Sequence, residues 1–450
     1  MSNRMIQKAV KAGLYALAGV AVTAGANAAT LDEALVQAWQ NNPTLAAERE
    51  SLAAAQNRVE EAQGGYYPQV KLFGGVGTSH NDVTFMPIPG FNLPLNEFSL
   101  NTRQVGIEAD QVLYAGGKVT GTVDIAQHQR DAEEAHMHGV EQGVLLDAAQ
   151  AYMNVLESQA VLALEQSNEN VLKQALDAAQ ANFDNGEVTH TDVDQAKARL
   201  AGTQAARIQA DGAVTAAMAT YERVIGTQPD NLQPPAALTG LPGSQQDALG
   251  LAEHNFAVIS AEAQSAAAQS NVDVAESSMK PSLTLVGQIS HANEPQFLFE
   301  KLDTRSIMLN LSIPLYAGGA LTSRMHAAKH EAASSEQQAL DARRQARDQV
   351  ISAWQAYQTA TAGLAAIQVQ ITAAQSAYDG VQAEYKEGER TTLDVLNAEQ
   401  ELLNAKVNQV KAQSDETVAE YSLKASTGSL TADDLHLKVQ KPADDTTASQ

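Results

Sequence analysis

The pentapeptide Leu113-Tyr114-Ala115-Gly116-Gly117 occurs twice in this chain of 450 residues, the second time at residues 315–319. An internal repeat with a long period indicates a duplicated structural unit. We therefore expect two copies of one unit, each with the same order of elements. The offset of 202 residues also aligns further identical pairs, among them Gly186 with Gly388, Asp192 with Asp394 and Leu200 with Leu402.

Turn-forming residues set the bounds of the two units. Pro234, Pro235 and Pro242 lie between them, and such a cluster of prolines favours a loop. The expected order is a first repeat at residues 29–232, a linker at 233–242, a second repeat at 243–432 and a polar, disordered tail at 433–450.

The first copy carries an insertion between its two β-type runs. The sequence Ala-Ala-Ala-Gln at residues 53–56 recurs at residues 266–269, an offset of 213 residues. This exceeds by 11 residues the offset of 202 that relates the two Leu-Tyr-Ala-Gly-Gly segments. The additional residues fall within residues 80–101, where prolines indicate a loop.

The first 28 residues have the layout of a secretory signal peptide. Arg4 and Lys8 precede a short apolar stretch at residues 12–22, and Ala26-Asn27-Ala28 matches a small-residue cleavage site. A membrane anchor is the alternative, but the stretch is shorter than the ~20 residues that span a bilayer. No later stretch reaches that length either. We therefore expect an exported chain that could span a membrane only with β-strands.

Composition excludes several classes of protein. The chain holds no cysteine, which rules out disulfide scaffolds, thiolate metal sites and cysteine nucleophiles. Its formal net charge of −24 argues against nucleic-acid binding, because nothing offsets repulsion by phosphates. His326 and His330 have the i, i+4 spacing of metal ligands, but no third ligand is evident, so we interpret them as surface histidines. Without a Walker loop, a dinucleotide fingerprint or a nucleophile–base motif, we expect neither an enzyme nor a cofactor.

Each Gly-Gly pair is followed by a long stretch of helical composition. Residues 118–184 contain no proline over 67 positions, and one continuous helix of that length would extend about 100 Å. Asn185-Gly186 predicts its end, and Thr189 or Thr191 is expected to cap a second helix. Because the second copy repeats this pattern, each unit should end in an antiparallel helical hairpin with a tight tip.

Ahead of the Gly-Gly pair, each copy has a helical stretch and two β-type runs. Residues 31–63 are rich in Ala, Gln and Glu, contain one proline, Pro43, and favour helix. Residues 282–291 and 306–315 alternate between apolar and polar side chains. Strands of about ten residues with one apolar face suit an outer-membrane barrel, although a half-buried hairpin of a soluble protein has the same periodicity.

Four strands per chain cannot close a membrane barrel, which needs about eight strands or more. Open strand edges are not tolerated in lipid, so a membrane-spanning chain of this kind must oligomerise. Two copies would supply eight strands around a filled interior, whereas three copies would supply twelve strands and leave room for a pore. The long helices would continue the barrel as a tube.

A segment at residues 385–398 reads Tyr-Lys-Glu-Gly-Glu-Arg-Thr-Thr-Leu-Asp-Val-Leu-Asn-Ala. With the duplicated layout and the repeated Leu-Tyr-Ala-Gly-Gly, it closely resembles the TolC family of outer-membrane efflux and secretion channels. The resemblance covers the chain from the leader to about residue 432. It implies an α+β membrane fold: a homotrimer in which each protomer gives four strands to one 12-stranded β-barrel and long helices to a periplasmic α-helical barrel. It also implies a place in the cell outer membrane, in contact with its lipid, with the helical domain in the periplasm.

The resemblance also implies a function. Members of this family are exit ducts of tripartite efflux or type I secretion systems. They dock a periplasmic adaptor (membrane fusion) protein and an inner-membrane ABC or RND-type transporter, and they passively conduct drugs, toxic compounds or proteins to the exterior. The alternative is a structural or adhesive coiled-coil protein of the periplasm or surface, which would explain the helices but not the alternating strands or the tip segment. A diffusion porin would need far more strands per chain.

Three tip residues match the periplasmic gate of the family, namely Asp192 of the first hairpin and Tyr385 and Arg390 of the second. In the family, polar links among such residues hold the tunnel shut. An Asp–Arg pair is a charge-assisted hydrogen bond that breaks at modest cost, which suits a releasable latch. The alternative is that these residues are ordinary helix caps and surface charges.

Other tip positions match the family in part. Family members often carry two Asp residues one helical turn apart as an acidic ring in the entrance. Here Asp394 is present, Asn397 stands at the second position, and Asp194 could restore some of the charge. The resemblance thus predicts cation preference with weaker block by multivalent cations. Gly186 and Gly388 match the tip glycines that contact adaptors, although acidic residues flank them here.

Overall fold

The computed structural model describes residues 30–82, 97–296 and 299–439. The expected signal peptide, residues 1–28, lies outside these ranges. So do the prolines of the loop predicted within residues 80–101.

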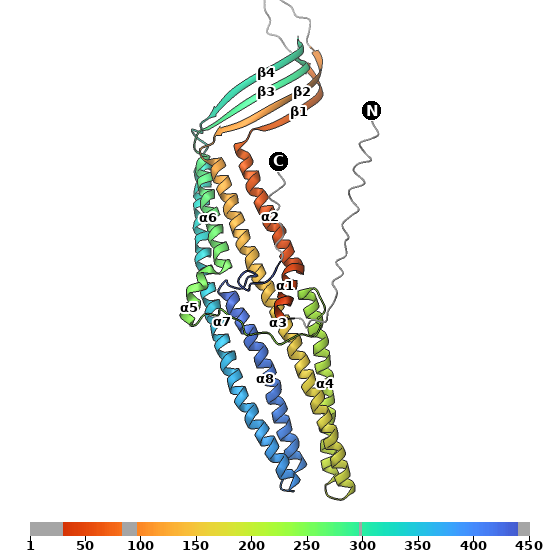
Figure 1. Ribbon diagram of the computed structural model, residues 1–450. Helices are drawn as coiled ribbons and strands as arrows, with labels where there is room; N and C mark the ends of the chain where they lie inside the picture. The colour runs from red at the N-terminus through yellow and green to blue at the C-terminus, as the bar shows by residue number, and fades with distance from the viewer. Residues whose placement is uncertain (1–29, 83–96, 297–298, 440–450) are drawn as a thin grey trace, which may run out of the picture.

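A four-stranded antiparallel sheet stands at one end of the molecule, and helices run away from it (Figure 1). The first copy supplies one strand hairpin and the second copy supplies the other. The two hairpins meet where the second strand pairs with the third, so the first and fourth strands form the edges of the sheet. In chain order, the strands are β1 (Gln69–Asp82), β2 (Glu97–Tyr114), β3 (Ser282–Gln296) and β4 (Phe299–Ser312).

The strands of the second copy differ in extent from their prediction. β3 continues five residues past the predicted end at His291, and β4 begins at Phe299 rather than at Ser306. The additional residues carry polar side chains on both faces, so the alternation that marks a strand in the sequence is lost there. β4 also ends at Ser312, earlier than predicted, because Pro314 cannot donate a ladder hydrogen bond.

The helices follow the same order in both copies (Figure 1). α3 and α7 each span 67 residues and run the length of the helical part. α3 packs against α2 and α6 near the sheet, and against α4 and α8 farther away. The first copy holds α1 (Leu31–Asn41), α2 (Pro43–Gln63), α3 (Lys118–Asp184) and α4 (His190–Ile225). The second holds α5 (Gln245–Leu251), α6 (Phe256–Ser277), α7 (Ala320–Lys386) and α8 (Thr392–Ser426).

The helix predicted over residues 31–63 is two helices, because the chain turns at Asn42. Pro43 has no amide hydrogen and occupies the first position of α2, while the Asn42 side chain accepts a hydrogen bond from the amide of Thr44 at 2.9 Å. Asn255 caps α6 in the same way, at the offset of 213 residues that relates the two copies. The turn is therefore part of the duplicated unit.

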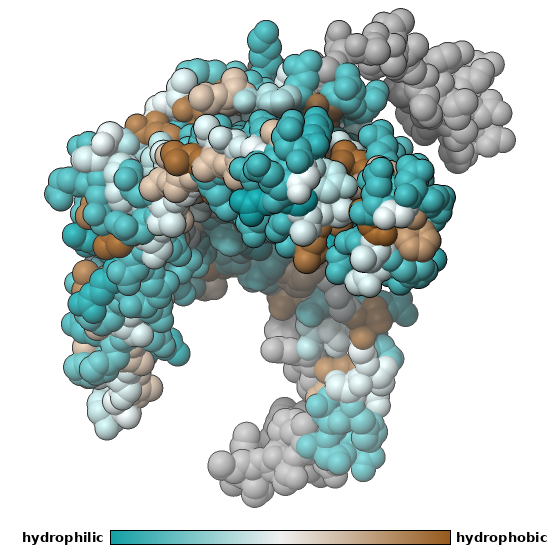
Figure 2. Space-filling view, turned by 90° about the horizontal axis from the view of Figure 1, so that it is seen from below, coloured by the Kyte–Doolittle hydropathy of each residue, from teal (hydrophilic) through white to brown (hydrophobic). Residues whose placement is uncertain are grey.

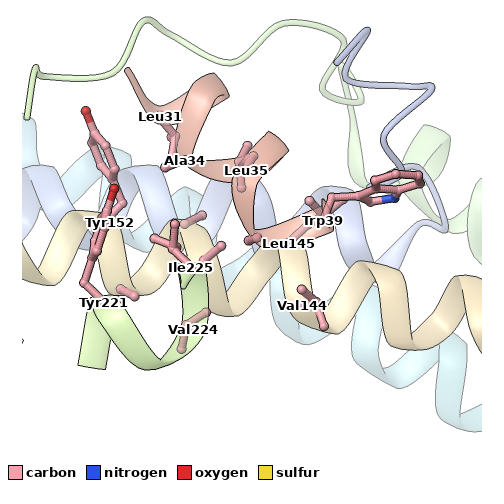
Figure 3. Close-up of a cluster of buried hydrophobic side chains, with 14 of the residues drawn as sticks. Leu31, Ala34, Leu35, Trp39, Val144, Leu145, Tyr152, Tyr221, Val224 and Ile225 are labelled. Carbon is pink, nitrogen blue, oxygen red and sulfur yellow. The ribbon is translucent and has the colours of Figure 1, made fainter. Parts of the chain in front are cut away.

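The largest buried cluster lies where α1, α3 and α4 meet (Figure 3). Leu35, Leu145 and Ile225 are fully buried in it. Tyr152 belongs to this cluster, and its hydroxyl donates a hydrogen bond to the carbonyl oxygen of Gln233 at 2.6 Å. This contact fastens the segment between the two copies onto α3.

The tail predicted to be disordered from residue 433 is ordered as far as Val439. Residues 433–439 follow α8 and fold back onto the same buried cluster. Burial of apolar side chains stabilises this segment despite its polar composition. The side chains that contact the cluster are those of Leu435, Leu437 and Val439.

Seen from the side of the hairpin tips, the molecule is an open arc with a mostly hydrophilic visible surface (Figure 2). None of the helices in the described part of the chain is both long enough and apolar enough to cross a membrane.

Candidate functional site

The tips of the two helical hairpins are built alike. Gly186 follows α3 with a φ of +81°, and Gly388 follows α7 with a φ of +79°. The amide of Gly186 donates to the carbonyl oxygen of Phe183 at 2.9 Å, and the amide of Gly388 donates to that of Tyr385 at 3.0 Å. Glycine takes this left-handed conformation without steric cost, so it closes the helix. The predicted ends of both long helices are confirmed.

Thr189 and Thr391 cap the helices that return from the tips. The amide and hydroxyl of Thr189 donate to Asp192 Oδ2 at 2.9 and 2.7 Å. The amide and hydroxyl of Thr391 donate to Asp394 Oδ2 at 3.0 and 2.8 Å. The hydroxyl of Thr189, then its amide, lowers the pKa of Asp192, and the amide of Thr391, then its hydroxyl, lowers the pKa of Asp394. Both tips therefore carry a fixed, ionised carboxylate at a helix N-terminus.

The three residues matched to a gate are not joined within one chain. Arg390 Nε donates to Glu384 Oε2 at 2.7 Å, within its own hairpin. The Tyr385 hydroxyl accepts from the hydroxyl of Thr392 at 3.4 Å. Across the described residues, no hydrogen bond or ion pair connects Asp192 with Tyr385 or Arg390, and the two tips lie apart (Figure 1). A link among the three requires a second chain or a movement of the hairpins.

The two hairpins are joined instead through Arg199 of α4 and Asn397 of α8. Arg199 Nη2 donates a hydrogen bond to Asn397 Oδ1 at 2.8 Å. In the sequence, Asn397 stands out only because it replaces a second acid, and Arg199 belongs to no recognisable motif. The contact joins residues 198 positions apart, so no local pattern could have revealed it.

The positions matched to an acidic ring occupy the same end of the molecule. Asp394 lies in the helix cap, and the exposed Asp194 has its Oδ2 2.9 Å from Nδ1 of His190. Other acidic side chains surround the tips and outnumber the cations Lys386 and Arg390. The resulting negative potential favours cations over anions at this end. The further acids at the tips are Asp184, Glu187, Glu384, Glu387 and Glu389.

The sheet has one apolar face and one polar face. The strand register places Leu72, Ile107 and Ile289 side by side across three strands, and all three are exposed. On the opposite face, Lys71 forms ion pairs with Glu108 and with Asp110, the latter at 3.4 Å. So large an exposed apolar surface is typical of a face that meets lipid or a partner. Its other large members are Val70, Val76, Val105, Ile307, Leu309 and Leu311.

Tyrosines mark the junction between the sheet and the helices. Tyr66 and Tyr67 precede β1, Tyr114 ends β2, and Tyr316 follows β4. All four are exposed, Tyr316 to 90%. Tyrosine combines an apolar ring with a polar tip, and it is enriched where a membrane surface meets water.

A buried polar network ties α1 to the end of the chain. Glu141 Oε1 accepts hydrogen bonds from Trp39 Nε1 at 2.8 Å and from the amide of Ala432 at 3.0 Å, and Oε2 lies 2.9 Å from His138 Nδ1. Burial raises the pKa of Glu141, but the hydrogen bonds from His138, Ala432 and Trp39 outweigh it and lower that pKa overall. The hydrogen bond to Glu141 raises the pKa of His138 against the effect of burial. The network is therefore strongest with an ionised Glu141 and a protonated His138.

His80, Asp82 and Glu97 form the one group within the described ranges whose donor atoms could hold a metal ion, at 4.8 Å or less from one another. All three are exposed at the end of the β1–β2 hairpin. Exposed acidic groups of this kind are common on protein surfaces, so we assign no metal to them.

Comparison with known proteins agrees with this geometry. A family model described as "Outer membrane efflux protein" matches residues 34–227 and 250–429, one segment in each repeat. The outer membrane efflux protein BepC of Brucella suis biovar 1 (strain 1330) is 33% identical over 436 residues, which cover 96% of this chain and 92% of that protein. The outer membrane protein TolC of Vibrio cholerae serotype O1 is 25% identical over 418 residues, covering 91% and 92%.

A solved structure shares the fold. The outer membrane protein VceC from Vibrio cholerae superposes with a TM-score of 0.75, at 20% sequence identity. The superposition covers 88% of this chain and 96% of that one.

Proposed function

Because the chain belongs to the outer membrane efflux protein family, we propose that it is the outer-membrane exit duct of a tripartite efflux or type I secretion system. It lies in the outer membrane with its helices in the periplasm, and it conducts its cargo without catalysing a reaction. One observation carries the proposal: a sheet with an apolar face runs directly into helices of 67 residues, which are too long for a globular core.

The duct is a homotrimer in this proposal. β1 and β4 are edge strands, and lipid does not tolerate unpaired edges. Three arcs of the kind seen in Figure 2 would join β1 of one protomer to β4 of the next and close a barrel of about twelve strands. The face with Lys71, Glu108 and Asp110 would line the water-filled interior, and the apolar face would meet lipid.

The energy for transport comes from partners in the inner membrane. An ABC or RND-type transporter, linked through a periplasmic adaptor, would deliver the drug, toxic compound or protein to the tips. Gly186 and Gly388 suit an adaptor contact, because no described atom beyond the adjacent residues lies within 4 Å of a Cβ added at either position. The backbone of both tips is thus open to a partner.

The gate forms between protomers in this proposal. Arg390 would exchange Glu384 of its own hairpin for Asp192 of a neighbouring protomer, with Tyr385 as a further link. Glu384 and Asp192 lie at the tips of different hairpins, so the exchange requires the tips of neighbouring protomers to meet. Asp394 and Asp194 would form the acidic ring that gives the entrance its preference for cations.

Cysteine cross-linking tests the trimeric barrel, because the native chain contains no cysteine. Gly75→Cys on β1 is combined in turn with Ser306→Cys, Met308→Cys or Asn310→Cys, all on the polar face of β4. In outer-membrane fractions, oxidation of at least one pair should give covalent dimers and trimers, while every single variant remains monomeric on a denaturing gel. Monomers alone from all three pairs would contradict the closed trimer.

A further inference from the structure

The outer end of the apolar face, away from the helices, carries cations. The register places Arg103 of β2 in one row with Val76, Asn293 and Lys301, on the face that also bears Ile107. Arg305 lies on the same face, four residues further along β4 and in the row of Ile107 and Ile289. We call Arg103, Lys301 and Arg305, all exposed, the cationic patch.

The cationic patch lies at the height expected for lipid headgroups. Lys301 and Leu311 are ten residues apart on β4, which is about 34 Å along a strand. A strand tilt of about 40° reduces this to about 26 Å, close to the ~25 Å height of the apolar band of an outer-membrane barrel. Tyr114 and Tyr316 lie at the opposite, periplasmic end. Arg103 and Lys301 therefore stand at the outer-leaflet surface. Arg305, four residues further along β4 in the row of Ile107, starts about 10 Å nearer to the helices, and its long side chain can extend toward the headgroups.

A hollow of about 410 Å³ opens beside Arg103. Arg103, His291 and Asn293 line it together with Val76 and Val105. The hollow exists because Gly74, in the row of Val105 and His291, has no side chain to fill it. Polar groups beside apolar walls suit an amphipathic ligand with an anionic head.

The neighbouring charges leave the cations of the patch available. Within the described ranges, Arg103, Lys301 and Arg305 make no ion pair and no side-chain hydrogen bond. The apolar face has three rows of paired residues from Lys301 to Arg305, and Asp303 is the one carboxylate in them. Its Oδ1 lies 2.6 Å from His291 Nδ1. Three cations thus face one carboxylate that already has a partner.

We propose that the cationic patch and its hollow bind a phosphorylated lipid of the outer leaflet. Arg103 donates to the phosphate oxygens, because a guanidinium matches phosphate in a two-pronged geometry. Lys301 and Arg305 neutralise the remaining charge, and an acyl chain runs along Val105 and Ile107. The inference rests on the outer-membrane location and goes beyond the duct function, since it assigns a lipid site on the outside of the barrel.

Lipid retention tests this site in the full-length protein. The protein is reconstituted with phosphatidylcholine and either a bisphosphorylated glucosamine lipid or the same lipid without phosphates, and the lipid retained is measured by native mass spectrometry. Wild type should retain the phosphorylated lipid about tenfold better than the phosphate-free one. Arg103→Gln and Arg305→Gln should each lose this preference. Lys71→Gln, on the opposite face of the sheet, should keep it.

Two results would overturn the lipid site: equal retention of both lipids by wild type, or an unchanged preference in both variants of the cationic patch. Conductance and trimer content are measured on the same samples. A conducting trimer without lipid preference contradicts the lipid site alone, whereas a wild-type protein that forms neither trimer nor pore contradicts the proposed duct.

Discussion

Arg199 of α4 donates a hydrogen bond to Asn397 of α8 at 2.8 Å and thereby joins the two hairpins of the chain. The pair lies seven residues from Asp192 and three residues from Asp394, just inside the tips. We therefore expect the spacing between the hairpins at their tips to depend on a contact within each protomer, in addition to the proposed latch between protomers.

The first prediction concerns this contact. Arg199→Gln should raise the open probability of the channel about tenfold, because three copies of a partly exposed contact, each worth about 0.5 kcal/mol, are lost together. Single-channel recording in a planar bilayer measures the open probability. Arg207→Gln is the matched control, since Arg207 lies on the same helix but pairs with Glu169 inside its own hairpin at 2.8 Å. Equal effects of the two variants, or none from Arg199→Gln, would contradict the role of the contact.

The second prediction concerns block by a trivalent cation. Wild type should be blocked weakly, because each protomer has Asn397 where a second acid would complete the ring. Asn397→Asp alone should change the block little, since Arg199 would neutralise the new carboxylate at 2.8 Å. Combined with Arg199→Gln, it should strengthen the block about tenfold. Micromolar block of wild type that disappears in Asp194→Ala would show instead that Asp194 completes the ring.

The third prediction separates the conformational role of the tip glycine Gly388 from its proposed contact with the adaptor. Gly388→Asn should preserve the tip, because Asn tolerates a φ near +79°, whereas Gly388→Val should destabilise it by about 2 kcal/mol. Thermal unfolding measures this difference. If the adaptor contacts the bare backbone, both variants should lose adaptor binding in a cross-linking assay. Full binding by Gly388→Asn would remove Gly388 from the adaptor interface.

The fourth prediction is a pH dependence from Glu141 and His138. The lowered pKa of Glu141 contributes stability that is present above its unfolded value of 4.5 and lost as the pH falls through the folded value. The raised pKa of His138 contributes stability that is fully present below 6.5 and lost as the pH rises through the folded value. Glu134 and Asp433 also favour the charged His138. The network should therefore stabilise the fold most between pH 4.5 and 6.5.

Unfolding followed by Trp39 fluorescence tests this pH dependence in a Trp354→Phe background. From pH 6 to pH 8.5, the midpoint should fall by about 2 °C more in the parent protein than in His138→Asn. Parallel curves for the two proteins would show that His138 does not titrate with the fold.

The sequence predicted the elements that depend on local signals. A stretch of 67 residues without proline and the Asn185-Gly186 pair defined α3, and both are confirmed. The turn at Asn42 was missed although Asn41, Asn42 and Pro43 signal it, because good helix formers dominate the rest of residues 31–63. The ordered tail was missed because Leu435 and Leu437 are too few to give a periodic pattern, and their burial depends on α3, far away in the sequence.

The sequence could predict which residues lie at the candidate site but not which contacts they make. The sequence placed Asp192, Tyr385 and Arg390 at hairpin tips, and the structure has them there. The sequence could not identify the hydrogen-bond partners of these residues. Arg390 can pair with Glu384 of its own hairpin or with Asp192, and which pair forms depends on how the protomers assemble. The latch between Asp192, Tyr385 and Arg390 stays a prediction.

Single-channel conductance in a planar bilayer tests the gated duct most directly, with wild type beside Arg390→Ser and Glu384→Gln. Wild type should conduct weakly, Arg390→Ser should conduct severalfold more because the latch is lost, and Glu384→Gln should conduct no more than wild type because Arg390 remains free to bind Asp192. No conductance from any of the three proteins, with insertion confirmed, would contradict the duct and favour a structural coiled-coil protein.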